Sequence, residues 1–322
     1  MNNLSRFSLK VLRKLFKNRS YKWRTDEFCD FLDQEGNDYI AHLLQNSNGQ
    51  GVMLAKFGTI ELNNIVASIL NKKKLVLDDY LKYIQGKIDI DIKGASYLLN
   101  KNAGVFPKEE YIVENFVKLA LEDCKLIDVL ASYIDKETYL KEELKSCKRV
   151  NLNAFYAPFF WKNPWTKELE GKRVLVVHPF VESIASQYHN RRELLFKDPN
   201  VLPEFKELIC IKAVQSLGGE KVPFKDWFEA LDFMKAEIDK CDYDIAIIGC
   251  GAYGMSLAAH VKLCGKIGIH LAGWTQMLFG VYGNRWIKAQ PEYSKFINEY
   301  WVRPNANEQI KNGNKVENGC YW

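Results

Sequence analysis

Short apolar runs alternate with helical patterns over most of this chain. The clearest runs are bounded by glycine, proline or charged residues, and each is followed by apolar positions at helical spacing. Runs of this kind are typical of strands buried on both faces, as in a parallel sheet. We therefore expect an α/β fold with a Rossmann-like, mostly parallel sheet flanked by helices. The expected strands are 52–57, 127–131, 150–152, 173–177, 208–214, 245–248 and 267–271. The expected helices are 26–47, 59–70, 109–123, 136–145, 181–188, 224–240 and 255–263, with 72–110 irregular.

Three of the expected strands run directly into a helix and carry polar residues at the junction. The first junction reads KFGTIE, with Lys56, Gly58, Thr59 as a predicted N-cap, and Glu61 in the first helical turn. The second places His178 at the end of its strand. Ligands of open parallel sheets bind at the carboxyl edge, so these residues are candidates for a site.

The third junction has the spacing G-x-G-x-x-G. It contains Gly249, Gly251, Ala252, Tyr253 and Gly254. Such a turn before a helix lets a phosphate or sugar approach the backbone, and it also simply packs a helix tightly on a strand.

A dinucleotide fingerprint has an acid after the following strand, to hold the ribose hydroxyls. Here that strand ends at His270, followed by Leu-Ala-Gly, so no NAD is expected. A nicotinamide-dependent oxidoreductase or epimerase remains an alternative based on the glycine turn alone.

Further candidates come from side-chain chemistry. His178 and His270 each end a strand, where an imidazole binds phosphate or positions an acceptor, or is simply buried with its hydrogen bond satisfied. Arg191 and Arg192 offer guanidinium groups for a departing diphosphate, or form a solvated helix end. The aromatic segment 155–165 favours a loop packed on the core over a sugar-stacking surface.

The N-terminal residues 1–24 carry eight Lys or Arg and no acid, with apolar residues between them at roughly helical spacing. This pattern predicts a basic amphipathic arm that lies on an anionic membrane surface, binds a partner, or is solvated. It lacks the apolar core of a signal peptide. We expect residues 25–322 to form a single α/β domain with a C-terminal capping segment.

Composition narrows the protein class. With 322 residues and 47% hydrophobic residues, the chain can bury a large core. Eight scattered cysteines without paired spacing indicate a reduced, cytoplasmic protein. The basic arm at 1–24 would hold it at the inner face of the membrane. The net charge is +5, but beyond the N-terminal arm the basic residues form no stripe with aromatic residues between them. Nucleic acid is therefore not an expected partner.

The three junctions together resemble one family. KFGTIE is similar to the R-[FY]-G-D-G-E segment of bacterial GT-D type glycosyltransferases, and AIIGCGAYGMSLAAHVKLCGKIGIHLAG to their later strand–glycine–helix–strand unit. RVLVVHPF lies at the corresponding place between them, so the resemblance spans roughly residues 50–275. The tail, with WVRP and a closing CYW, resembles proteins of bacterial capsule and surface-polysaccharide clusters.

This resemblance implies a hexosyltransferase that moves a sugar from a nucleotide sugar to a glycan or lipid-linked acceptor. It also implies that Glu61 holds a divalent metal, Mn or Mg, or activates the acceptor hydroxyl. The family has Asp where this chain has Thr59, so either Glu61 holds the metal with phosphate oxygens and water or the protein works without one. The missing carboxylate also leaves open a non-catalytic nucleotide- or glycan-binding protein.

Overall fold

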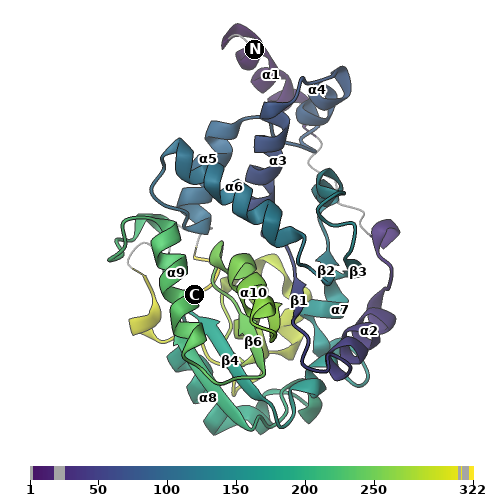
Figure 1. The fold of residues 1–322 in the computed structure, drawn as a ribbon, viewed down its shortest axis with the longest axis vertical. Helices are drawn as coiled ribbons and strands as arrows, with labels where there is room; N and C mark the ends of the chain where they lie inside the picture. The colour runs from purple at the N-terminus through teal and green to yellow at the C-terminus, as the bar shows by residue number, and fades with distance from the viewer. Residues whose placement is uncertain (1–2, 18–25, 311–312, 314–318) are drawn as a thin grey trace.

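The computed structural model describes residues 3–17, 26–310, 313 and 319–322 (Figure 1). Its strands form one seven-stranded sheet in the order β3-β2-β1-β7-β6-β4-β5, and every neighbouring pair is parallel. The expected α/β, Rossmann-like fold is therefore confirmed. The strands are β1 (Val52–Ala55), β2 (Val129–Ser132), β3 (Lys148–Asn151), β4 (Arg173–His178), β5 (Glu207–Lys212), β6 (Ile245–Ile248) and β7 (Ile267–His270).

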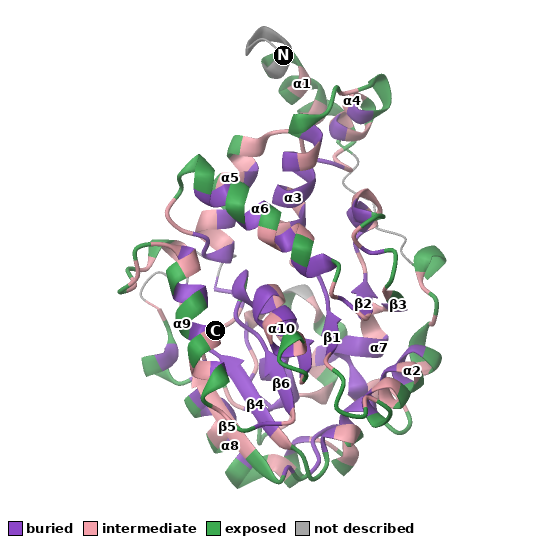
Figure 2. Cartoon of the chain, viewed as in Figure 1, coloured by how far each residue is buried: buried purple, intermediate pink, exposed green. Residues whose placement is uncertain are grey.

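The strands are apolar on both faces because helices cover both. In β1, Met53 and Ala55 pack into one hydrophobic cluster, while Val52 and Leu54 pack into the other. All four residues are buried, as Figure 2 shows for most of the sheet. Alternate side chains of a strand point to opposite faces, so a continuous apolar run is what a covered parallel strand requires.

The chain changes direction twice across the sheet, and this sorts the helices between the two faces. A right-handed crossover places its helix on one face when the chain moves toward β3 and on the other when it moves toward β5. Accordingly α3, α6, α9 and α10 share one cluster with the sheet, whereas α2, α7 and α8 share the other. The longer helices are α1 (Asn3–Phe16), α2 (Asp33–Gln45), α3 (Thr59–Lys72), α4 (Leu77–Ile84), α5 (Ile92–Ala103), α6 (Glu110–Cys124), α8 (Val181–Leu195), α9 (Trp227–Asp239) and α10 (Tyr253–Leu263). The short ones are α7 (Leu152–Tyr156) and α11 (Trp274–Leu278).

The segment expected to be irregular, 72–110, instead contains α4 and α5, which extend the helical layer beyond the sheet (Figure 1). Helix α5 packs on α3 through the buried Leu99, and Asp91 caps its start by accepting from the amide of Gly94 at 3.5 Å. The sequence prediction was wrong because both helices are short and Gly94 interrupts the pattern.

The expected charged surface helix at 136–145 is also wrong. A short 3-10 helix, Asp135–Leu140, takes its place. Glu137 is buried there, and it accepts from the amides of Tyr133 and Ile134, both at 3.1 Å. These bonds turn the chain at the end of β2 and leave no long exposed helix.

The tail after α11 crosses the second face and buries Trp286 and Trp301, in keeping with a capping segment. A bridge between Val281 and Val302 joins its two limbs. Among the described residues, no helix is long and apolar enough to cross a membrane.

A buried acid joins α6 to α10 and gives a prediction about stability. Asp123 is buried and accepts from Ser256 Oγ at 2.5 Å, and burial raises its pKa to about 6. A carboxyl whose pKa is raised by folding stabilises the fold while protonated, and this contribution is lost as pH rises through about 6. Asp123→Asn, which still accepts from Ser256, should therefore stabilise the protein at pH 8 by roughly 1–3 kcal/mol. Urea unfolding at pH 8 and pH 5 checks this, since the gain should shrink at pH 5. Equal destabilisation at both values would contradict the account.

Candidate functional site at the carboxyl edge of the sheet

A cavity of about 510 Å³ lies at the carboxyl edge of the sheet. Its walls come from the segments that follow all seven strands, together with the end of α5 and the C-terminal tail. Its volume is in the range of small-molecule sites. The parallel direction of the strands is what brings these distant segments together, so the cavity is the candidate site.

Lys56 enters the cavity directly after β1. The side chain is buried, and its Nζ donates to Tyr133 Oη at 3.2 Å. The ammonium also lies 4.8 Å from the ring centre of Tyr133 and 5.4 Å from that of Tyr156. Ring faces stabilise a cation without neutralising it, so Lys56 brings positive charge to the cavity wall.

Tyr133 fixes the loop after β1 in place. Its hydroxyl donates to the carbonyl of Phe57 at 2.9 Å and lies 3.1 Å from Thr59 Oγ1. Because the phenol has one proton, the Thr59 hydroxyl is the donor in that second contact. Burial, with a smaller contribution from the charge of Glu61, raises the pKa of Tyr133, so the phenol stays neutral.

Glu61 lines the cavity and also sits in the first turn of α3. The N-cap of this helix is Gly58, not Thr59 as expected. A Cβ added to Gly58 would lie 1.9 Å from Glu61 Oε2, so the carboxylate folds back over the N-cap residue. The helix dipole favours an acid in this first turn, and the same residue lines the cavity.

Arg285 is a charged cavity residue that the sequence interpretation missed. It opens a short π-helix, Arg285–Ala289, in the tail. Its guanidinium carbon lies 4.5 Å from the ring centre of Tyr321, and Nη2 is 3.3 Å from Cys320 Sγ. The sequence pattern predicts only a capping role for the tail. The one local sign that Arg285 belongs to a site is its position beside Trp286.

Three amides of the glycine turn are hydrogen-bonded within the protein. The N–H groups of Gly249, Ala252 and Gly254 donate to the carbonyls of Val177, Ala103 and Gly251, at 2.9, 3.4 and 3.1 Å. Ala103, at the end of α5, thus packs against the turn. Gly249, Gly251 and Tyr253 line the cavity, whereas Ala252 and Gly254 do not.

The glycines instead make room for two buried histidines. A Cβ on Gly254 would lie 2.1 Å from Cε1 of His270, and one on Gly249 would lie 2.4 Å from the carbonyl oxygen of Ala272 and 2.8 Å from Cδ2 of His178. Gly251 has a φ of +60°, which glycine adopts without strain. The spacing that suggested a phosphate cradle is thus required by close packing around two imidazoles and by one left-handed turn.

Both histidines line the cavity and are neutral at physiological pH. Burial lowers the pKa of each to about 3, and the charge of Lys56 adds to this for His270. Nδ1 of His178 accepts from the amide of Phe180 at 3.0 Å, so the ring proton is on Nε2. His178 can therefore donate a hydrogen bond from Nε2, and its low pKa does not suit a general base.

Arg191 and Arg192 lie away from the cavity. They sit near the end of α8, about 15 Å along the helix from its start at the cavity. Arg191 donates to the carbonyl of Tyr300 at 3.2 Å, and Arg192 pairs with Glu193 at 3.0 Å. The diphosphate role expected of them does not fit this position, because α8 carries them toward the opposite edge of the sheet.

The donor set around Glu61 does not fit a divalent metal held by the protein. Glu61 is the one carboxylate among the described residues that line the cavity. The neighbouring Thr59 hydroxyl is engaged with Tyr133, and Lys56 and Arg285 bring positive charge. A hard cation such as Mg²⁺ or Mn²⁺ prefers several oxygen ligands, so one carboxylate beside two cationic side chains disfavours a metal here.

No model of a known protein family matches this chain, and neither a curated protein nor a solved structure matches it. The resemblance to the GT-D type enzymes therefore rests on the quoted segments alone.

The packing of Gly254 on His270 is directly testable. Gly254→Ala should destabilise the protein by roughly 1–3 kcal/mol, because its methyl group would overlap the imidazole. Adding His270→Ala should restore part of this loss, since the double variant removes the overlap. Urea unfolding of both single variants and the double variant measures the coupling. Strictly additive losses would show that the two residues do not pack as described.

Proposed function

We propose that the chain is a glycosyltransferase that transfers a sugar from a nucleotide sugar to a glycan or lipid-linked acceptor without a metal held by its own side chains. One observation carries the proposal. A lysine, an arginine and a single carboxylate meet in an aromatic-walled cavity at the carboxyl edge of a parallel sheet. This combination supports a ligand with a diphosphate and a polar ring system.

Lys56 and Arg285 bind the diphosphate in this proposal. Both lie near the same two tyrosines. Lys56 lies over the rings of Tyr133 and Tyr156. The charge of Arg285 lowers the pKa of each phenol, against the larger effect of burial, which raises it. Cations held before the ligand arrives stabilise the negative charge that develops on a leaving diphosphate.

Glu61 activates the acceptor in this proposal. Its carboxylate takes the proton of the acceptor hydroxyl as that oxygen bonds to the anomeric carbon. The bond from this carbon to the diphosphate oxygen breaks, and its electron pair leaves with the nucleoside diphosphate. His178 donates from Nε2 to orient a ligand oxygen, and the aromatic wall that includes Trp274 and Tyr321 gives a sugar or base apolar contact.

The nicotinamide alternative gains no support from this geometry. Ala103 bonds to an amide of the glycine turn, and β7 ends at His270 without an acid. Both features disfavour a dinucleotide bound with its pyrophosphate on the glycine turn and its ribose on an acid after the next strand.

Calorimetry with UDP, GDP, CMP and NAD tests the diphosphate site. Arg285→Gln should weaken binding of the preferred nucleoside diphosphate by about 10- to 100-fold, the effect of losing a charge-assisted hydrogen bond. Arg192→Gln, an arginine away from the cavity, is the matched control and should leave binding unchanged. Tighter binding of NAD than of any nucleotide, or equal effects of the two variants, would overturn the assignment.

The role of Glu61 needs a separate measurement. Glu61→Gln should keep nucleoside diphosphate binding but slow sugar release from the matching nucleotide sugar by about 100-fold or more. Release of the nucleoside diphosphate, with water as acceptor, is the readout. A variant as fast as the wild type would remove Glu61 from the mechanism, and a wild type that binds without release would favour the non-catalytic alternative.

Helix α1 supports association of the enzyme with a membrane. Lys10 pairs with Asp91 at 2.8 Å, and Arg13 donates to the carbonyls of Tyr83 and Ile88, so two of the basic residues hold the helix on the protein. The apolar residues are left outside, with Phe7 66% exposed and Leu15 71% exposed. Lys22 and the other basic residues at 18–25 lie outside the described part.

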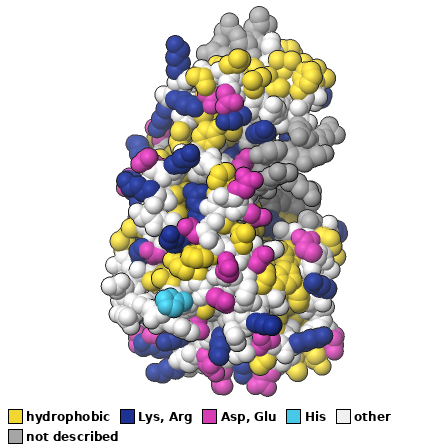
Figure 3. Space-filling view, turned by 90° about the vertical axis from the view of Figure 1, so that its right-hand side faces the viewer, with side chains coloured by type: hydrophobic (Ala, Val, Ile, Leu, Met, Phe, Trp, Pro, Cys, Tyr) yellow, Lys and Arg dark blue, Asp and Glu magenta, His cyan; other side chains and the backbone are white. Residues whose placement is uncertain are grey.

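The apolar surface continues onto α4. Val76 and Leu77 are 59% and 74% exposed beside it, and hydrophobic side chains gather at this end of the molecule in Figure 3. The exposed Lys14 and Lys17 flank the apolar stripe of α1. We propose that this surface inserts into an anionic lipid headgroup layer, because an apolar stripe between cations is complementary to it.

Vesicle sedimentation tests this surface. The double variant Phe7→Ser, Leu15→Ser should reduce binding to phosphatidylglycerol-rich vesicles by about 10-fold or more, from the apolar area it removes. Leu263→Ser, which changes an equally exposed leucine at the end of α10, should leave binding unchanged. Equal binding of wild type and double variant would contradict membrane insertion through α1.

A further inference from the structure

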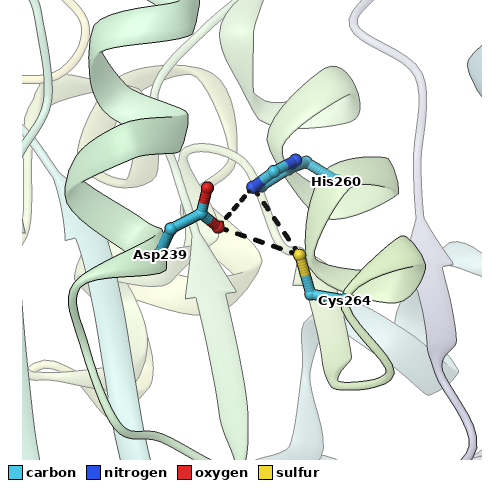
Figure 4. A group of neighbouring side chains, drawn as sticks. All are labelled: Asp239, His260 and Cys264. Carbon is cyan, nitrogen blue, oxygen red and sulfur yellow. Dashed lines mark hydrogen bonds and ion pairs between the residues drawn. The ribbon is translucent and has the colours of Figure 1, made fainter.

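Three side chains of metal-binding type converge where α9 and α10 end. Asp239 is the last residue of α9, while His260 and Cys264 stand one turn apart at the end of α10. Figure 4 shows all three pointing toward one another. This cluster lies at the far end of α10 from the cavity, about 16 Å along the helix.

Their spacing is close to that of a tetrahedral site. Cys264 Sγ lies 3.8 Å from both His260 Nε2 and Asp239 Oδ1. Zinc bonds of about 2.0–2.3 Å place neighbouring ligand atoms roughly 3.3–3.6 Å apart. The third pair, His260 Nε2 and Asp239 Oδ1, is hydrogen-bonded at 2.7 Å, so a metal would replace the shared proton and part these atoms by about 0.6 Å.

The surroundings suit a cation. Two helix C-termini meet here, and their negative dipole ends favour positive charge. The neighbouring lysines are engaged elsewhere, Lys240 with Glu237 at 2.5 Å and Lys262 with Asp128 at 2.7 Å. The side chain of Asp239 is 50% exposed, so an ion has an entry path and water can complete its coordination.

A cysteine beside a histidine and an aspartate also suggests a nucleophile. Here burial and the charge of Asp239 raise the pKa of the Cys264 thiol, which works against a reactive thiolate. A metal ion displaces the thiol proton on binding, so the same residues remain suited to coordination.

We propose that Asp239, His260 and Cys264 form a binding site for a thiophilic divalent cation of the zinc class, with water as the fourth ligand. One thiolate and one imidazole select zinc over magnesium or calcium, which prefer oxygen ligands. The bound ion ties the end of α9 to the end of α10. The site is separate from the cavity, and its occupancy does not depend on the proposed transfer reaction.

Zinc titration of the full chain against a chromophoric chelator tests the site. The wild type should bind one equivalent here, and Cys264→Ser should weaken that binding by about 100-fold or more. Cys241→Ser, a half-buried thiol two residues beyond Asp239, is the matched control and should bind as the wild type does. Cobalt should give a thiolate charge-transfer band in the wild type and in Cys241→Ser, and lose it in Cys264→Ser.

Two results would overturn the proposal. One is zinc binding that is unchanged in Cys264→Ser, and the other is a wild type that shows no cobalt–thiolate band. Both variants alter side chains that are at least partly exposed, so circular dichroism can verify that each keeps the wild-type fold before metal is added.

Discussion

The parallel direction of all seven strands is the constraint on which this structure depends. A parallel neighbour can be reached only by a crossover that carries the chain back to the starting edge, so every strand ends at the same edge of the sheet. The segments after the strands therefore crowd together, although they lie more than 200 residues apart in the chain. The cavity, its charges and its aromatic walls all follow from this one arrangement.

Crowding at that edge also explains the glycine turn. The chain after β6 must pass the carbonyl of Ala272 and the imidazole that ends β7, and only glycine leaves space at positions 249 and 254. A motif usually associated with phosphate binding here relieves a steric conflict between protein groups. In the proposed function, the positive charge for a diphosphate comes instead from Lys56 and from Arg285 of the tail, which also line the cavity.

Local patterns predicted much of this fold and part of the site. Strands such as β4 and β6 were readable because they are continuous apolar runs bounded by charge or glycine, and Lys56, Gly58, Thr59 and Glu61 do line the cavity. Helices α4 and α5 could not be predicted, because they pack on other helices, α4 on α1 and α5 on α3, and their own spacing does not show this.

The contact of Ala103 with Ala252 and the approach of Arg285 to Tyr133 join segments that are about 150 residues apart. No local pattern encodes such contacts. For the same reason Arg191 and Arg192 looked suitable by side-chain type alone, although α8 carries them away from the cavity.

The central claim is that the cavity holds a diphosphate between Lys56 and Arg285. A crystal structure of the full chain with the nucleoside diphosphate that binds best in solution tests it most directly. The account predicts that phosphate oxygens contact Lys56 Nζ and the guanidinium of Arg285, with Glu61 facing the open side of the cavity. A diphosphate seated on the backbone of Gly251 with Ala103 displaced, or bound at Arg191 and Arg192, would contradict it.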